Sequence, residues 1–243
     1  MTVEFLKKNI MSLPSIVLER AFAIYVYGSV ARGDNDADSD CDLFVCIDDC
    51  PESDYLQLKE AVSIWEEKYK CEFSFYQVSM LVKMQKRGSY FLWHIRKEGI
   101  LLFQQNEVFK SILTNLCPYG ETREDFLEYS EILGDIERSV YQDNITLEYE
   151  LSVLAVLARN ICIGCCYLMG NMDFGRRTPV IKCINFFKNR FPFSLTSYDE
   201  LYEFRLALIR NKSINCELVS VEYVEDWIEK IKKLLILALE MEE

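Results

Sequence analysis

The stretch from Tyr25 to Val45 constrains the fold of this chain more than any other part of the sequence. Aromatic and β-branched residues over 22–27 predict a strand that ends at Gly28. Gly28 and Ser29 predict a turn into a short helix, and a second, alternating strand is expected over 40–47 after a loop rich in Asp and Asn. The chain is therefore expected to place this turn beside the second strand of one sheet.

Two acidic residues, Asp40 and Asp42, mark the start of the second predicted strand. Side chains two apart on a strand point to the same face, so these carboxylates repel each other unless a cation lies between them. A divalent metal is the natural cation. Backbone N–H groups at a helix start favour an anion, and a glycine such as Gly28 lets phosphates approach closely. With Ser29, these residues predict a metal–triphosphate site.

A third acid, Glu72, lies at the start of another predicted strand over 71–78. The alternation places Glu72 on one face and Phe73 and Phe75 on the other. A charge beside so many apolar residues suggests a partner, such as the same metal site. The alternative is a glutamate at the edge of the sheet and exposed to solvent.

The other segments predict an α+β fold of two domains. A helix broken near Pro14 is expected over 4–21, and a helix capped by Ser53 is expected over 53–69. The apolar side of the second helix is expected to consist of Leu56, Val62, Ile64 and Trp65. A mixed-sheet domain over 1–115 precedes an all-helical bundle over 116–243. Further elements are expected at 90–98 (helix), 100–103 (strand), and 122–141, 146–169, 178–190, 197–211 and 221–241 (helices).

The net charge of −12 disfavours a general nucleic-acid binder, which needs a basic surface. The charge is unevenly distributed. Residues 121–150 hold ten acids and two Arg, whereas residues 176–212 hold eight basic residues and three acids. The two segments could serve a cationic and an anionic substrate, or they could be ordinary solvated helix faces.

Cytoplasmic location is expected, because no apolar run reaches the length of a membrane span and the first residues do not resemble a secretory signal. Ten cysteines are present, mostly inside apolar patterns. Only Cys162 and Cys165 form a CxxC pair, without a second pair or a histidine at zinc spacing. Most of the cysteines are therefore expected to be reduced, buried thiols.

The sequence resembles the nucleotidyltransferase superfamily that includes DNA polymerase beta. Gly28-Ser29, ten residues and Asp40-Cys-Asp42 match its hallmark. Residues 27–33 and 39–43 look like the minimal nucleotidyltransferases, and the Glu72 strand is similar to that of the kanamycin-type aminoglycoside nucleotidyltransferases. The helical half resembles, more loosely, their C-terminal bundle and the related HEPN domains.

The resemblance implies an in-line attack on the α-phosphate of a nucleoside triphosphate, expected to be ATP, with Mg²⁺ held by Asp40, Asp42 and Glu72. Gly28 and Ser29 would hold the β- and γ-phosphates.

Basic contacts to the nucleotide are expected from Lys182, with Arg176 and Arg177 near it, and from Arg32. Arg32 could instead pair with the acids at 34–38. Glu72 is also a candidate general base, and Glu148 and Glu150 are the alternatives from the helical half.

The acidic 121–150 segment favours a small cationic acceptor such as an aminoglycoside, a reaction of antibiotic resistance. Alternatives are transfer to a protein or tRNA in a toxin–antitoxin or defence context, and a non-catalytic antitoxin or binding module. RNA cleavage of the HEPN type is disfavoured because His94, the only histidine, lies outside the helical half and is expected to serve packing. A homodimer is compatible with the sequence, and no membrane partner is expected.

Overall fold

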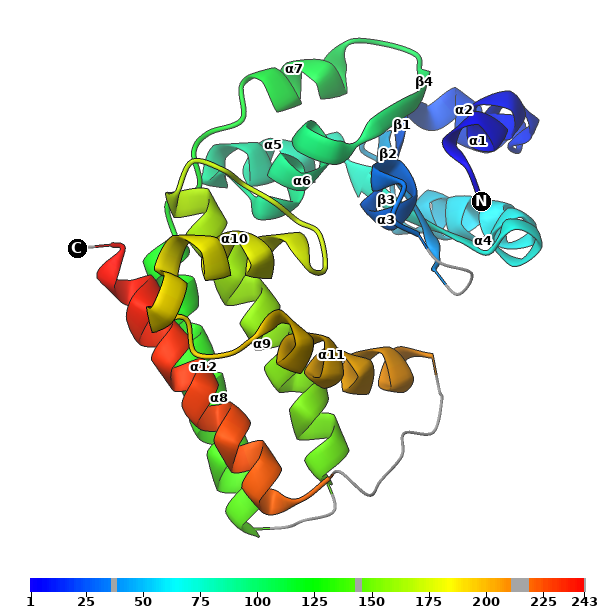
Figure 1. The fold of residues 1–243 in the computed structure, drawn as a ribbon. Coiled ribbons are helices and arrows are strands. Elements are labelled where there is room, and N and C mark those ends of the chain that lie inside the picture. The colour runs from blue at the N-terminus through cyan, green and yellow to red at the C-terminus, as the bar shows by residue number, and fades with distance from the viewer. Residues whose placement is uncertain (36–38, 143–145, 211–218, 243) are drawn as a thin grey trace. The chain divides into compact units, whose positions relative to one another are not determined.

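The protein is described here by a computed structural model that covers residues 1–35, 39–142, 146–210 and 219–242. It divides into two compact units, Met1–Gly120 and Glu121–Glu243 (Figure 1). The first unit contains a mixed sheet with helices and the second is helical in its described residues. This is the α+β fold class that the sequence predicts.

A four-stranded mixed sheet forms the centre of the N-terminal unit. Its strand order is β3-β2-β1-β4; β1 pairs antiparallel with β2 and β4, and β2 pairs parallel with β3. The two strands that flank the Gly-Ser turn are therefore direct neighbours. The strands are β1 (Ala21–Tyr27), β2 (Cys41–Ile47), β3 (Cys71–Gln77) and β4 (Ile100–Gln104).

Helices cover both faces of this sheet (Figure 1). Residues of α1, α2 and α4 pack on one face, whereas residues of α5, α6 and α7 pack on the other. The break expected near Pro14 separates η1 from α2. The helical elements are α1 (Val3–Asn9), η1 (Ile10–Ser12), α2 (Ser15–Arg20), α3 (Gly28–Arg32), α4 (Glu52–Tyr69), α5 (Val78–Arg87), α6 (Tyr90–Glu98) and α7 (Val108–Thr114).

The central strand β2 is buried on both faces, so the predicted alternation of buried and exposed residues along it is wrong. Leu43 and Val45 belong to one hydrophobic core, and Phe44 and Cys46 belong to the other. The sequence of a strand covered by helices on both faces is a nearly continuous run of apolar residues. Asp42, only partly buried at the start of the strand, is the exception.

Helix α4 buries two of the four residues that the sequence placed on its apolar side, Val62 and Trp65, and exposes the other two. Leu56 and Ile64 are 59% and 75% exposed, whereas Leu58, Val62 and Trp65 are buried. These three buried residues follow the i, i+4, i+7 spacing of one helical face. The expected cap is also wrong, since the helix begins one residue before Ser53 with Pro51 at the N-cap position.

Side chains of α4 also hold the outer edge of β3 in place. Lys59 Nζ donates to the Phe73 carbonyl at 2.5 Å, and Glu66 accepts the Phe73 N–H at 2.8 Å. An edge strand otherwise leaves such groups without a partner in the sheet. These two bonds fix the backbone next to Glu72.

The helical unit is organised around α9, which contacts α8, α10, α11 and α12. By length and composition α9 could cross a membrane, but 67% of its most apolar window is buried among the other helices, as in the core helix of a bundle. Position 211, where the fourth helix was expected to end, lies outside the described residues. The elements are α8 (Thr122–Gln142), α9 (Leu147–Leu168), α10 (Thr178–Phe187), η3 (Lys188–Arg190), α11 (Leu195–Ile209) and α12 (Val221–Glu240).

A glycine allows α8 and α9 to approach each other closely. A Cβ on Gly164 would lie 2.6 Å from Cε1 of the fully buried Phe126 ring. We expect Gly164→Ala to destabilise the protein by about 1–3 kcal/mol, the usual cost of overpacking a core. Thermal unfolding measures this effect. Gly134→Ala on α8 is the matched control, because its Cβ meets only Arg138 at 3.6 Å and should stabilise the helix slightly. Equal effects of the two changes would contradict close packing at Gly164.

Candidate active site

Three strand ends meet at one edge of the sheet. Tyr27, the last residue of β1, is paired with Asp42 on the antiparallel strand β2. Asp42 is in turn paired with Glu72 on the parallel strand β3. Residues in register on neighbouring strands present their side chains to the same face. The sheet therefore brings Asp42 and Glu72 side by side, with Asp40 two residues earlier in the chain.

The Gly-Ser turn lies directly against the Asp42 carboxylate. Gly28 has φ +70°, in the left-handed region, and a Cβ on it would lie 2.5 Å from Asp42 Oδ2. Only glycine combines this backbone conformation with so close an approach. Ser29 follows in α3, and its carbonyl accepts the N–H groups of Gly33 and Asp34 at 2.9 and 3.1 Å.

Burial and the neighbouring acids change the ionisation of Asp42. Burial, followed by the nearby charges of Glu72 and Asp40, raises its pKa to about 6, against the opposing influence of His94 and Arg32. Burial and then the Asp42 charge raise the pKa of Tyr27 to about 12, so Tyr27 remains protonated at neutral pH. A cation beside Asp42 would remove this electrostatic penalty.

The carboxylates at this edge of the sheet suit a magnesium ion whose remaining ligands come from a substrate. Among the described residues, no group of three or more His, Cys, Asp or Glu side chains is close enough to hold a metal by itself. The predicted trio of Asp40, Asp42 and Glu72 thus does not form a closed cage. Mg²⁺ usually binds one or two carboxylates and takes its other ligands from phosphates and water. The neighbouring Asp42 and Glu72 fit that pattern.

Arg32 is held by two acids. Its Nε donates to Asp34 at 3.2 Å, which agrees with the alternative that it pairs with the acidic loop; positions 36–38 of that loop lie outside the described residues. Its Nη1 donates to Glu98 at 2.8 Å. Glu98 also accepts from His94 at 3.1 Å. Sequence reasoning missed the contact with Glu98.

The basic residues predicted to bind nucleotide in the helical unit are largely paired. Lys182 bonds Asp173 at 2.8 Å and the Asn171 side chain at 3.0 Å. Arg177 pairs with Asp199 at 2.8 Å. Arg176 lies over the Tyr202 ring at 5.6 Å, also within this unit.

The two alternative bases of α9 differ in environment. Glu150 is 6% exposed and accepts a hydrogen bond from Ser139 at 2.7 Å, so it contributes to the packing of α8 on α9. Glu148 is exposed. Of the two, Glu148 is the more accessible to a substrate.

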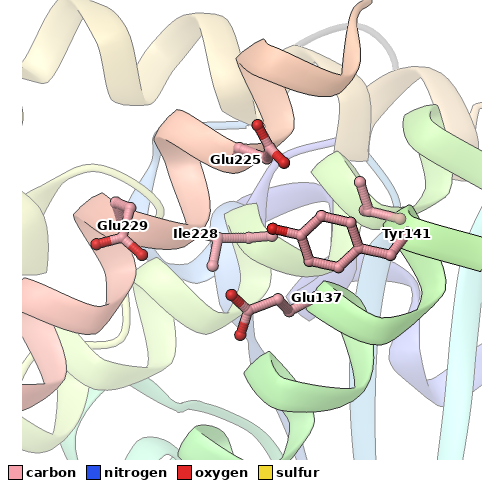
Figure 2. A pocket seen from close by; sticks show the side chains of 6 residues that line it. Glu137, Tyr141, Glu225, Ile228 and Glu229 are labelled. Carbon is pink, nitrogen blue, oxygen red and sulfur yellow. The ribbon is translucent and has the colours of Figure 1, made fainter.

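A pocket of about 240 Å³ lies between α8 and α12 (Figure 2). Val140 and Ile228 give it an apolar part. Lys232 bonds two of its acids, Glu137 at 3.0 Å and Glu229 at 2.9 Å. The whole lining consists of Glu137, Val140, Tyr141, Glu225, Ile228 and Glu229.

Comparison with known proteins identifies the N-terminal unit. Residues 17–108 match the family described as "Polymerase beta, Nucleotidyltransferase". No curated protein matches the chain. The fold is similar to that of the spectinomycin adenyltransferase AAD(9) from Enterococcus faecialis, solved with ATP and spectinomycin, with a TM-score of 0.56 and 14% identity over 96% of this chain and 100% of that chain.

A second solved structure, a toxin–antitoxin with AMP-PNP, is less similar. It has a TM-score of 0.35 and 15% identity over 54% of this chain and 98% of that chain, too little to establish a common fold. The family match spans β1 to β4 and contains the Gly-Ser turn and all three predicted acids. The N-terminal unit therefore carries a polymerase beta-type nucleotidyltransferase domain, and the protein is a nucleotidyltransferase enzyme.

Proposed function

We propose that the protein transfers AMP from ATP to a hydroxyl of a small cationic acceptor, such as an aminoglycoside, and releases pyrophosphate. The observation that carries the proposal is the pairing of Asp42 with Glu72 beside the Gly28 backbone. Phosphoryl-type transfer depends mainly on positioning and on charge stabilisation. This edge of the sheet supplies carboxylates and a turn that a triphosphate can approach.

Asp40 and Asp42 would hold Mg²⁺, which when bound neutralises charge on the α-phosphate and the leaving pyrophosphate. Glu72 would either share the metal or take the proton of the acceptor hydroxyl. Gly28 and Ser29 would orient the β- and γ-phosphates through backbone N–H groups and the serine hydroxyl.

The transfer forms a bond between the acceptor oxygen and the α-phosphorus and breaks the bond to pyrophosphate. The acceptor proton passes to a carboxylate. Glu72 is exposed at the edge of the sheet and is our first choice, whereas Glu148 is the candidate from the helical unit.

A small acceptor is favoured over tRNA by the ion pairs of the helical unit. Lys182, Arg177 and Arg190 each pair with an acid of the same unit. Such pairing reduces the positive charge that a phosphate backbone would need. The acidic helix α8 suits a cationic acceptor instead. We assign the protein to the cytoplasm, where ATP is available.

The test is to incubate the protein and Mg²⁺ with each α-labelled nucleoside triphosphate and a panel of acceptors: aminoglycosides including spectinomycin, tRNA, and proteins. We expect label from ATP on an aminoglycoside. Label on tRNA or protein alone would instead support a macromolecular acceptor. If calorimetry detected no binding of Mg-ATP, the fold would serve as a non-catalytic binding module.

A further inference from the structure

The side chain of Glu98 joins two elements that flank the Gly-Ser turn. It is the last residue of α6 and is 10% exposed. Its Oε2 accepts from Arg32 Nη1 at 2.8 Å and is 3.1 Å from His94 Nε2. An ionised carboxylate only accepts hydrogen bonds, so the His94 Nε2 carries a proton in this pair.

Glu98 remains ionised although it is nearly buried. Burial alone would raise its pKa, but the hydrogen bonds from His94 and Arg32 outweigh this and hold the pKa below the usual value. A buried carboxylate is stable only with such partners. The cluster is therefore a charged, satisfied network rather than a surface ion pair.

Both partners of Glu98 connect to the residues around the turn. Arg32 ends α3, the short helix that begins at Gly28. The ring of His94 packs edge-on against Tyr27, the residue before Gly28, at 5.5 Å between centroids. Glu98 thus ties α6 to the chain on both sides of the Gly28–Ser29 turn.

Arg32 and Asp42 lie on the same side of this network. Arg32 ends the short helix that begins at Gly28, and a Cβ on Gly28 would lie 2.5 Å from Asp42 Oδ2. Without Glu98, Arg32 would keep Asp34 and would be drawn more strongly to Asp42. A guanidinium on Asp42 would compete with a metal ion for that carboxylate.

We propose that Glu98 is a positioning residue of the nucleotide site: through Arg32 and His94 it holds the Gly28–Ser29 turn for the triphosphate and keeps Arg32 away from Asp42. This role rests on the proposed function. Glu98 does not touch the reacting atoms. Its effect is on the affinity for Mg-nucleotide rather than on the transfer itself.

The test compares Glu98→Gln with a matched control in the full chain. Asp54→Asn removes the acid of another helix-bridging pair in the same unit, Arg20–Asp54 at 2.5 Å, with side chains 29% and 30% exposed. Calorimetry with Mg-ATP gives Kd, and thermal unfolding gives Tm. We expect Glu98→Gln to weaken Mg-ATP binding about tenfold, as for loss of a charged hydrogen bond, while Asp54→Asn leaves Kd unchanged.

Two further variants separate positioning from folding. Glu98→Asp keeps the charge and should recover part of the affinity. In an Arg32→Ala background, Glu98→Gln should weaken Mg-ATP binding much less than in the wild type. The reason is that Arg32, through which Glu98 acts on the nucleotide site, is already absent. Equal weakening in both backgrounds would contradict the route through Arg32.

The outcomes distinguish this role from the proposed function. Normal Mg-ATP binding by both the wild type and Glu98→Gln, even with a lowered Tm, would overturn the positioning role alone. Absence of Mg-ATP binding by the wild type would overturn both.

Discussion

Asp42→Asn is expected to stop nucleotide transfer and, in the same protein, to raise the stability of the metal-free form. Transfer should fall by at least about 10³-fold, because a metal ion held by Asp42 supplies several kcal/mol of charge stabilisation. The asparagine keeps the shape of the side chain beside Gly28 and removes only the charge. Release of pyrophosphate from ATP measures the loss.

The gain in stability follows from the raised pKa of Asp42. Its pKa is about 6 in the folded protein against an ordinary value of 3.8. A raised folded pKa favours the protonated form, so the folded state loses stability as the pH rises from about 4 through about 6. At pH 7.5 the charge therefore opposes folding, by on the order of 1 kcal/mol after allowance for solvent screening.

Calorimetric unfolding in the presence of a chelator tests this second effect. We expect Asp42→Asn to unfold a few degrees above the wild type at pH 7.5 and at nearly the same temperature at pH 4. Asp48→Asn, one residue beyond the far end of β2, is the control; it should retain transfer and gain no stability, since Asp48 pairs with Arg20. Full transfer activity in Asp42→Asn would contradict the assignment of Asp42 as a metal ligand. A Tm difference that does not change with pH would contradict the raised pKa of Asp42.

The arrangement of the site was predictable where it depends on local pattern. The strand that ends at Tyr27, the turn at Gly28 and the strand that carries Asp42 follow from periodicity and turn chemistry. Period-two alternation also predicted that Phe73 points away from Glu72. What the sequence did not reveal is that Asp42 and Glu72 are in direct register, which depends on the parallel pairing of two strands that are distant in the chain.

Errors arose where burial depends on distant parts of the chain. The exposure of Ile64 and the burial of Phe44 follow from which surfaces the helices cover, and no local pattern states this. Helices α5 and α7 were not predicted.

Glu98 was missed for a related reason. It is 66 residues from Arg32, its partner, and ends a helix in a run of charged residues that resembles an ordinary helix terminus. The one local signal was the i, i+4 spacing of His94 and Glu98 on the predicted helix.

Gly28→Ala is expected to abolish most of the activity while Asp42 and Glu72 are intact. The new Cβ would lie 2.5 Å from Asp42 Oδ2, so either the carboxylate or the turn must move. A displacement of about 1 Å at a reacting centre can reduce the rate about 10²-fold. The left-handed φ adds about 1–2 kcal/mol of strain for a residue with a Cβ. Initial rates with labelled ATP measure the first effect, and thermal unfolding measures the second.

Gly33→Ala separates the clash from the strain. Gly33 has φ +76°, almost the same as Gly28, but a Cβ on it would meet nothing within 4 Å. Both variants should therefore lose a similar amount of stability from backbone strain, and only Gly28→Ala should also lose Mg-ATP binding. If Gly33→Ala reduced Mg-ATP binding as strongly as Gly28→Ala, backbone strain at the ends of α3 would explain the loss of binding. The close approach of Gly28 to Asp42 would then not be its cause. The contact between Gly28 and Asp42 joins the Gly-Ser turn to the metal-binding carboxylates. This pair of variants therefore tests whether the turn and the carboxylates act as one site.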